Sequence, residues 1–550
     1  MPVAQSRRTF IAAISQGASL LLTSSGVGCS AVSAKTPRRY RSANLSDRMQ
    51  RAYDLRCEAA FFQKSRPLPS DVTNDDDRRY ATSFASYSKV LPHDETGEVN
   101  QSAYRAMVKA IESGVPSDFQ AIPLGGTVKL VNPQASYSFG LQGADSYHVD
   151  LPAAPAFASA ESAADMAEVY WQAILRDVPF SQYAAAPEAL AAAADLSRFA
   201  DFRGPRTSGF VTPAVLFRGS TPGDLVGPYV SQFLYGRIPQ GVYSLDQRFR
   251  MPLKGVDYLT SHADWIASQR GAEPLVDPSL ESVSRFIRTG RDLSRFVHRD
   301  YTFQAFLNAA HILLSAQDAY LVPTPYSPRA CAYSPKHPFP TTEDGFSTFG
   351  AAQILDAVTS VANLALRASW RQKWTLHRRP RPEVFAQRFD RVVHHGASYP
   401  IHSDLMRSSL RDHFASENLL LPVAYPEGAP AHPSYPAGHA AVAGACATVL
   451  KAFFREDVEF QAPVRPADDG LTVIPYEGPR LHVGNELNKL ASNIALGRDF
   501  AGIHFRSDCS AGLSLGERVA CAYLADVRRC LTEEFDGFTL TTFSGDIVSL

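Results

Sequence analysis

The first of three chemically suggestive segments in the C-terminal half of the sequence carries two cations close to prolines. Lys373 is followed by Arg381, which stands between Pro380 and Pro382. Because proline fixes its own backbone and restricts the residue before it, Arg381 is expected in rigid, extended backbone that can aim a guanidinium group. Taken alone, the segment is more simply explained as the solvated basic end of a helix, where cations interact favourably with the helix dipole.

The second segment places a histidine at the start of an apolar helix. A turn containing Pro436 and Gly438 precedes His439 and a stretch to Cys446 that is apolar almost all round, which predicts a buried helix. The free amides at such a helix start bind anions, and Gly438 lets the backbone approach the anion. His439 can exchange protons near neutral pH, although a capping or core-edge histidine is an alternative interpretation.

The third segment contains Arg498, Gly502, His504 and Asp508. Arg498 and His504 are separated by about 600° of helical turn, so a continuous helix would point them to different sides. Gly502 permits a bend that brings them together. His504 and Asp508 are one turn apart on a common helix face, where the carboxylate can orient the imidazole; a purely structural ion pair is the alternative for Asp508.

These side chains need helices to position them. Apolar residues at three- and four-residue steps predict helices at 46–62, 101–113, 161–175, 188–199, 282–290, 301–317 and 348–378. Strand signals are sparse, the clearest being the alternation at 538–543. We therefore predict a mainly α fold of helix bundles with long loops and minor β-hairpins.

Composition limits the possible functions. The chain has 550 residues, of which 45% are hydrophobic and 20% charged, so disordered, collagen-like and short disulfide-stabilised classes are excluded. Lys and Arg number 54 against 55 for Asp and Glu, which gives no broad basic surface for nucleic acid. Apolar stretches are interrupted before the length that a membrane span requires, so no transmembrane segment is expected.

The N-terminus resembles a twin-arginine export signal. Arg7 and Arg8 precede Phe10 and a weakly apolar stretch, and small residues up to Ala34 suit signal cleavage. We expect a signal at 1–34, a mainly helical region at 35–340 and a site-bearing helical region at 341–550, with the mature protein periplasmic or secreted. Six cysteines remain beyond Cys29, and some of them are expected to pair in an oxidising compartment.

The order of the three segments resembles the vanadium-dependent haloperoxidases, whose signature is shared with bacterial class A acid phosphatases and lipid phosphatases. That signature runs Lys, Arg-Pro, Ser-Gly-His and Arg-x5-His-x3-Asp. The spacing from Lys373 to Arg381 and the run from His432 to Pro436 look most like the algal and cyanobacterial bromoperoxidase branch. Similar stretches at 223–233 and 290–293 extend the resemblance over residues 45 to 545. One departure is Ala437, which stands where the family usually has the serine.

The resemblance implies vanadate as cofactor. A buried tetrahedral oxyanion needs nearby cations and N–H donors, and the family pattern assigns them to this chain. Its cofactor-binding positions are Lys373, Arg381, Ala437, Gly438, Arg498 and His504, of which His504 is the direct ligand of the metal. Structural calcium and assembly into a homo-oligomer are further expectations from the family.

The resemblance also implies a reaction and its catalytic residues. Hydrogen peroxide would oxidise bromide or iodide to hypohalous acid, which halogenates an organic acceptor. His439 would be the acid/base residue, Lys373 the cation that polarises the peroxide oxygen, and His432 the residue that favours bromide and iodide over chloride. Trp370 is a second candidate for the halide pocket, and Asp300 for a carboxylate behind the cations, unless it is a surface charge.

Two other functions fit the same residues. Phosphate has the shape of vanadate, so His504 would be the nucleophile and His439 the general acid of a phosphatase. An exported oxyanion-binding protein without turnover is suggested by Ala437, but the retained His439 argues against it, because simple anion capture needs no titrating histidine.

Overall fold

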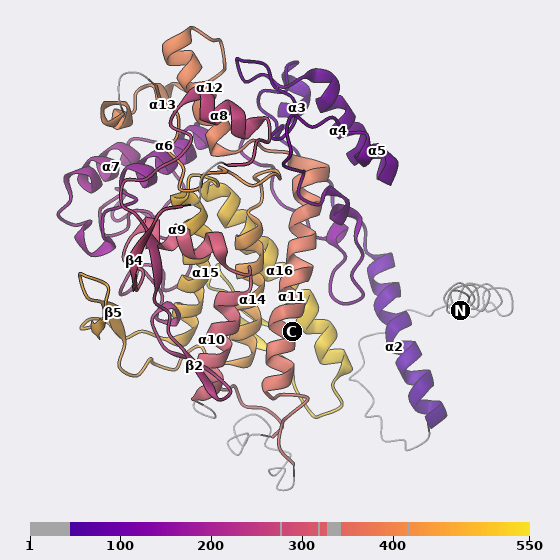
Figure 1. Ribbon diagram of the computed structural model, residues 1–550. Coiled ribbons are helices and arrows are strands. Elements are labelled where there is room, and N and C mark those ends of the chain that lie inside the picture. Colours follow the sequence, from indigo (N-terminus) through magenta and orange to yellow (C-terminus); the bar gives the residue numbers. More distant parts are fainter. Residues whose placement is uncertain (1–44, 275–277, 317–319, 327–342, 415–417) are drawn as a thin grey trace, which may run out of the picture. The chain divides into compact units, whose positions relative to one another are not determined.

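The computed structural model describes residues 45–274, 278–316, 320–326, 343–414 and 418–550 (Figure 1). Within them the chain is mainly helical, with four small two-stranded antiparallel sheets, which confirms the predicted fold class. Met1–Gln50 and Arg51–Leu550 form separate units, and the helix bundle and its site belong to the second. The predicted signal at 1–34 lies outside the described residues, and the predicted boundary at 340 stays a prediction.

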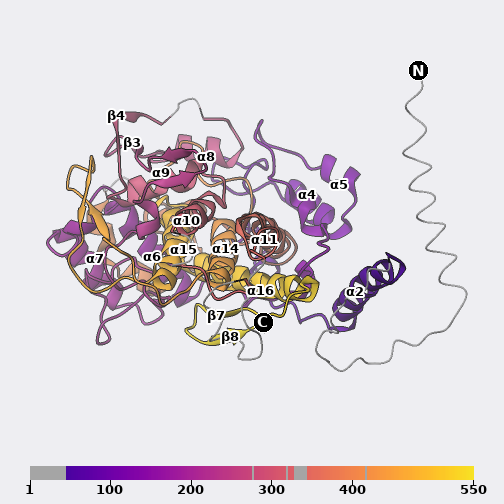
Figure 2. The ribbon, with the colours of Figure 1, turned by 90° about the horizontal axis from the view of Figure 1, so that it is seen from below.

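The core of the bundle is helix α14 (Gly438–Phe453), which is buried along nearly its whole length. It packs against α11 (Ala351–Arg371), α15 (Val483–Phe500) and α16 (Arg506–Cys530) (Figure 2). Two glycines allow the closest of these contacts: a Cβ at Gly444 would overlap the Leu513 carbonyl, and one at Gly516 would overlap the Ala441 carbonyl. The helix that begins at the predicted anion seat is thus fixed by backbone contact with α16.

Helices α9 (Gly290–Arg299) and α10 (Gln304–Ser315) extend this bundle. α9 packs on α15, and α10 packs on α11 and α14. α9 begins with a capping box, in which Thr289 and Asp292 exchange hydrogen bonds with each other's backbone amides. The last turn of α9 therefore lies at a defined place beside α15, the helix that carries Arg498.

A second group of helices covers the other side of the site-bearing segments. α6 (Ala160–Ile174) packs against α12 (Pro382–His395) and is almost wholly buried, including Asp165 and Glu168. α4 (Gln101–Ser113) contributes Tyr104 and Met107 to a small core that also holds Trp370 and Trp374. Within the described residues, the remaining α-helices are α2 (Leu45–Ser65), α3 (Asp76–Arg79), α5 (Pro116–Gln120), α7 (Pro187–Ser197), α8 (His262–Gln269) and α13 (Ser403–Met406).

Each sheet pairs two short strands. The pairs are β1 (Ile238–Gln240) with β2 (Tyr243–Leu245), β3 (Phe249–Pro252) with β4 (Leu280–Arg285), β5 (Val464–Pro466) with β6 (Val473–Pro475), and β7 (Thr539–Thr541) with β8 (Ile547–Ser549). β7 confirms the strand expected near the C-terminus.

Two sequence expectations for secondary structure need correction. The helix expected at 282–290 is wrong: residues 280–285 form β4, which pairs with β3, and the capping box at Thr289 starts a helix only at Gly290. The helix expected at 348–378 stays α-helical from Ala351 to Arg371 and then continues as a π-helix, Gln372–His377. π-Turns inside helices often occur at functional sites.

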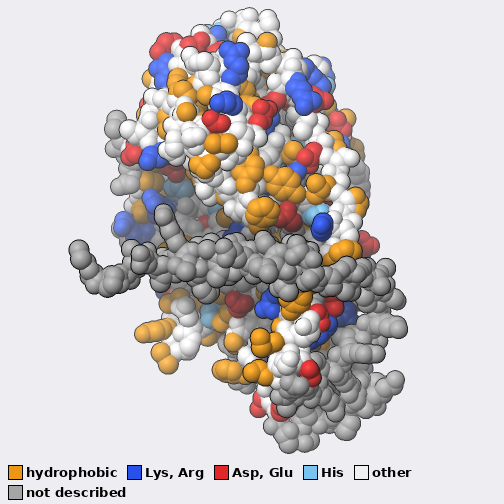
Figure 3. Space-filling view, turned by 90° about the vertical axis from the view of Figure 1, so that its right-hand side faces the viewer, with side chains coloured by type: hydrophobic (Ala, Val, Ile, Leu, Met, Phe, Trp, Pro, Cys, Tyr) orange, Lys and Arg blue, Asp and Glu red, His pale blue; other side chains and the backbone are white. Residues whose placement is uncertain are grey.

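Three further observations concern the surface and the thiols. Cys57, Cys446, Cys509, Cys521 and Cys530 are free thiols, so the expected pairing is absent among them, and Cys331 lies outside the described residues. In the described part of the chain, no helix is long and apolar enough to cross a bilayer. Basic and acidic side chains are interspersed on the face drawn in Figure 3, consistent with the formal net charge of -1.

Candidate active site

Lys373 lies in the π-helical turn and is fully buried. Its Nζ donates to the carbonyls of Pro433 and Ser434, both at 2.7 Å, so the lysine links this turn to the loop that carries His432. Burial, with the charge of Arg381, lowers the pKa of Lys373 well below its usual value. A buried ammonium held among other cations favours an anion beside it.

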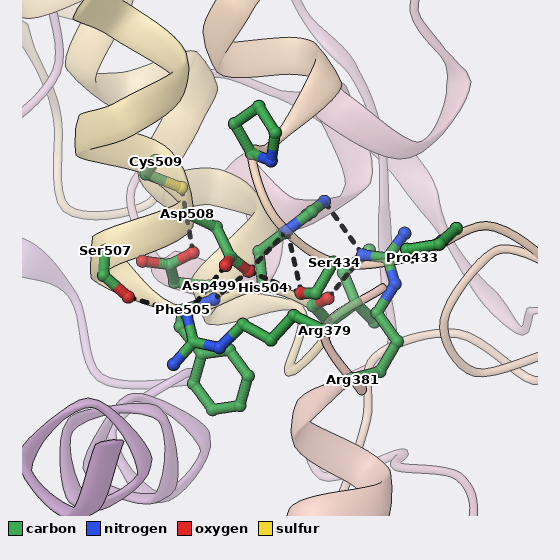
Figure 4. Close-up of polar contacts among 12 residues, drawn as sticks. Arg379, Arg381, Pro433, Ser434, Asp499, His504, Phe505, Ser507, Asp508 and Cys509 are labelled. Atoms are coloured by element: carbon green, nitrogen blue, oxygen red, sulfur yellow. Dashed lines mark hydrogen bonds and ion pairs between the residues drawn. The ribbon is translucent and has the colours of Figure 1, made fainter. Parts of the chain in front are cut away.

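Arg381 has the extended backbone that its flanking prolines predicted, and it forms the N-cap of α12. Its guanidinium donates to the carbonyls of His432 (3.0 Å) and Ile503 (2.7 Å), and its Nη1 lies 2.8 Å from Nε2 of His504 (Figure 4). Burial lowers the pKa of Arg381 to about 10, so the side chain stays charged at neutral pH. One arginine therefore contacts both histidine-bearing segments.

His504 lies between two helices rather than on one. α15 ends at Phe500, Gly502 has a φ of +80° that favours glycine, and α16 starts at Arg506. The expected bend at Gly502 is confirmed. The expected shared helix face for His504 and Asp508 is wrong, because His504 precedes the helix.

The expected contact between His504 and Asp508 exists nevertheless. Asp508, in the first turn of α16, accepts a hydrogen bond from the backbone amide of Phe505 (3.1 Å), and its Oδ2 lies 2.9 Å from Nδ1 of His504. The hydroxyl of Ser434 also donates to this oxygen. Burial opposes ionisation, but Arg379 and these hydrogen bonds hold the pKa of Asp508 far below its usual range.

Arg379 is a functional residue that the sequence reasoning missed. It donates to Asp508 (2.8 Å) and to Asp165 of α6 (3.2 Å), and its guanidinium lies 4.1 Å from the centroid of the Phe505 ring. Burial raises the pKa of Asp165 to about 6. The available signal was Asp165 itself, a carboxylate on a helix whose other periodic residues are apolar and which therefore needs a buried partner.

His439 stands at the start of α14 with its side chain 16% exposed, which leaves it reachable from solvent. Its Nε2 lies 2.9 Å from Oδ1 of Asp300, which follows α9. Burial lowers the pKa of His439, and Asp300 partly opposes that shift. Asp300 is thus a buried partner of His439, with its Oδ2 lacking a hydrogen-bond partner among the described residues, and not a surface charge.

The remaining predicted residues lie around the same place. Ala437, fully buried, is the N-cap of α14 and its amide donates to the Asp508 carbonyl at 2.9 Å. A Cβ at Gly438 would lie 3.2 Å from the Trp370 ring, so glycine keeps this helix start open. His432 packs against Trp370 with ring centroids 4.8 Å apart, and burial with the charge of Arg381 lowers its pKa strongly.

Arg498 belongs to the same electrostatic cluster. In addition to the larger effect of burial, its charge lowers the pKa of Lys373, Arg381 and His439. Its Nη1 donates to the Val297 carbonyl at 2.5 Å. The structure therefore brings all three predicted cations and the three predicted histidines into one buried region.

The charge balance of this region fits a bound oxyanion. Within the described residues, no carboxylate forms an ion pair with Lys373, Arg381 or Arg498, whereas other buried cations such as Lys89 and Arg506 have carboxylate partners. Buried charge without a counter-ion is costly, so a bound anion beside these cations would be favourable. The described residues hold no group of three or more His, Cys, Asp or Glu side chains arranged around a metal ion.

Comparisons with known proteins identify the family of the chain. Residues 355–533 match the family model described as the VCPO second helical-bundle domain. The chain is 31% identical to a vanadium-dependent bromoperoxidase of Corallina pilulifera, over 92% of this chain and 99% of the relative. It is 33% identical to one of Ascophyllum nodosum, over 85% and 86%.

A solved structure extends the likeness to the whole fold. The homohexameric second vanadate-dependent bromoperoxidase of Ascophyllum nodosum superposes with a TM-score of 0.84 and 27% identity, covering 97% of this chain and 95% of that one. Sequence identity over nearly the full length and the shared fold lead to one conclusion. The chain belongs to the vanadium-dependent bromoperoxidase family.

Proposed function

We propose that this protein is a haloperoxidase that uses vanadate and hydrogen peroxide to oxidise bromide or iodide to hypohalous acid, which then halogenates an organic acceptor. The observation that carries the proposal is the buried cluster of Lys373, Arg381 and Arg498: none of the three forms an ion pair with a carboxylate of the described residues, and Arg381 contacts His504. Membership of the bromoperoxidase family supports it.

The residues present fit vanadate. Lys373, Arg381 and Arg498 would neutralise its charge, the Gly438 amide would donate to it, and Nε2 of His504 would bind the metal. When bound, vanadate supplies a Lewis acid that activates hydrogen peroxide without changing its own oxidation state.

His439 and Asp300 would handle the proton that hydrogen peroxide must lose. A carboxylate only accepts hydrogen bonds, so the proton of the neutral imidazole lies on Nε2, facing Asp300, and Nδ1 is free to accept another. The lowered pKa of His439 keeps the ring neutral near pH 7, as a base requires. Asp300 then stabilises the imidazolium that forms.

His432 and Trp370 would form the halide side of the site. The imidazole of His432 is buried beside the Trp370 ring and close to Nη2 of Arg381 (3.0 Å). Moving an anion out of water to a buried site costs less when the anion is large and weakly hydrated, which favours bromide or iodide over chloride. In His432→Phe we expect the relative rates with bromide and chloride to change, with vanadate binding retained.

One assay series tests the proposal against its alternatives. The apoprotein is given bromide, hydrogen peroxide and a phenol dye, with and without orthovanadate, and phosphate-ester hydrolysis is measured in parallel. We expect halogenation only with orthovanadate, and competition by excess phosphate. Halogenation by vanadium-free protein would contradict the proposal. Ester hydrolysis without halogenation would identify a phosphatase, and vanadate binding without either activity an oxyanion-binding protein.

Three broader expectations also stay proposals. We propose export through the twin-arginine-type signal at residues 1–34, testable by locating the protein before and after Arg7 and Arg8 are replaced by lysine. We also propose a homo-oligomer, by analogy with the homohexameric Ascophyllum bromoperoxidase, testable by light scattering. Structural calcium is testable by elemental analysis of the purified protein.

A further inference from the structure

Arg498 is held differently from the other two cations of the site. Lys373 donates to two carbonyls, and Arg381 makes several hydrogen bonds through Nε, Nη1 and Nη2. Arg498 donates through Nη1 to Val297, and its Nε is buried without a hydrogen-bond partner in the described chain. Hydrogen bonds alone therefore leave its guanidinium poorly fixed.

A tyrosine ring supplies the missing support. The guanidinium carbon of Arg498 lies 5.6 Å from the ring centroid of Tyr425, which is only 2% exposed. A cation over an aromatic face is attracted more strongly when both groups are removed from water. The hydroxyl of Tyr425 donates to the Ser294 carbonyl at 2.6 Å, so the ring is anchored to α9, the helix whose Val297 carbonyl receives Arg498.

A histidine on the same helix fixes the ring further. His298 stacks on Tyr425 with ring centroids 3.7 Å apart and an interplanar angle of 10°. Nε2 of His298 lies 2.6 Å from a carboxylate oxygen of Glu427, two residues beyond Tyr425. The C-terminal end of α9 thus fixes both side chains. It holds Tyr425 through Ser294 and His298, and it holds Arg498 through Val297.

We propose that Tyr425 is a positioning residue for Arg498: its ring, anchored through Ser294 and stacked on His298, holds the guanidinium in the orientation that binds the anion. The proposal rests on the proposed function, since it assumes that Arg498 faces a tetrahedral oxyanion. Tyr425 touches neither peroxide nor halide in this assignment. Its effect must therefore appear in anion affinity.

The test compares two substitutions of Tyr425 with a matched control. The apoprotein is titrated with orthovanadate and, separately, with inorganic phosphate by calorimetry. Tyr425→Phe keeps the ring and its stack on His298 but loses the hydrogen bond to Ser294, so both dissociation constants should rise about threefold, whereas Tyr425→Leu removes the ring and should raise both about tenfold or more. The control is Tyr399→Leu, which removes a ring 5.1 Å from Arg388, outside the site, and should change neither constant.

His298 provides a second, independent arm. His298→Ala should weaken binding of both anions about threefold, and His298→Phe, which restores a stacking ring, should recover most of that loss. Wild-type affinity in Tyr425→Leu would overturn the proposal, as would an equal loss in Tyr399→Leu, which would indicate general destabilisation. If the wild type binds phosphate but does not oxidise halide, the proposed function fails. The role of Tyr425 is still decided in that case, by comparing the phosphate affinities of Tyr425→Leu and Tyr425→Phe. If the wild type binds neither anion, both proposals fail.

Discussion

Nδ1 of His504 and Oδ2 of Asp508 lie 2.9 Å apart, while Nε2 of the same histidine lies 2.8 Å from Nη1 of Arg381. The Asp508 carboxylate can only accept a hydrogen bond, and the Arg381 guanidinium can only donate one. The neutral ring must therefore carry its proton on Nδ1, facing Asp508, and its lone pair on Nε2, facing Arg381. Burial and Arg381 keep the pKa of His504 well below its usual value, so this neutral form prevails at pH 7. The imidazole is preset in the tautomer that a metal ligand requires.

Removing the charge of Asp508 should disturb that tautomer. In Asp508→Asn the amide can donate as well as accept, so the preference for a proton on Nδ1 is lost. We expect the affinity for orthovanadate to fall about ten- to a hundredfold, as for other partners of metal-binding histidines. Glu168→Gln is the matched control, because it breaks a comparable buried pair with Arg506 without touching His504. Wild-type affinity in Asp508→Asn would show that Arg381 alone fixes the ring.

Substitutions of His504 and His439 should separate vanadate binding from catalytic turnover. His504→Ala removes the proposed metal ligand, so bound vanadium should disappear from the purified protein. His439→Ala should retain much of the vanadium and lose bromide oxidation, because the proposed base is absent. Elemental analysis and the halogenation assay on the same samples measure both quantities. Loss of vanadium in His439→Ala, with retention in His504→Ala, would reverse the assignment.

Asp300 should control the pH dependence of the reaction. Burial lowers the pKa of His439 and the negative charge of Asp300 opposes that shift, so Asp300→Asn should lower the pKa further. Activity that requires neutral His439 is lost as pH falls through this pKa, and the acidic limb of kcat/KM should move to lower pH in the variant. The maximum rate should also fall about tenfold or more, because the ring loses its orienting partner. A pH–rate profile of bromide oxidation with an unmoved acidic limb would assign that limb to another group.

Local patterns made much of this site predictable, and long-range contacts account for what was missed. The extended backbone of Arg381, the bend at Gly502 and the start of α14 at Gly438 depend on residues within a few positions of each other. The pair of His439 with Asp300 joins residues 139 apart, and that of Arg379 with Asp165 joins residues 214 apart. No periodicity specifies such partners, because packing of separate helices creates them. β4 was missed for the same reason, since its pairing with β3 outweighs a weak local helix pattern.

Buried histidines should make the fold sensitive to acid. Burial, with nearby arginines, lowers the pKa of His377 to about 3, so between about pH 3 and 6.5 the unfolded chain binds a proton that the folded protein excludes. Its contribution to stability is complete above pH 6.5 and is lost as pH falls, at about 1.4 kcal/mol per pH unit. In His377→Gln the free energy of unfolding should therefore fall less steeply below pH 6.5. Denaturant unfolding of both apoproteins at several pH values measures the slopes, and parallel slopes would contradict this account.

Ala437 stands where the family resemblance leads us to expect a serine, and its surroundings indicate what a serine there would do. The nearby hydroxyl of Ser434 already donates to Asp508, so it does not replace the missing donor toward the anion. At the N-cap of α14, a serine oxygen would accept a hydrogen bond from a first-turn amide while its proton pointed to the anion.

In Ala437→Ser we therefore expect two separable gains. The apoprotein should be stabilised by about 1 kcal/mol through the helix cap, measured by denaturant unfolding without vanadate. Orthovanadate should bind about ten- to a hundredfold more tightly, because a hydrogen bond to a charged oxygen contributes about 1.5 to 3 kcal/mol. The wild type should correspondingly lose vanadium on dialysis faster than the serine variant. A stability gain with unchanged vanadate affinity would mean that the hydroxyl serves the helix alone and that the three cations already saturate the anion.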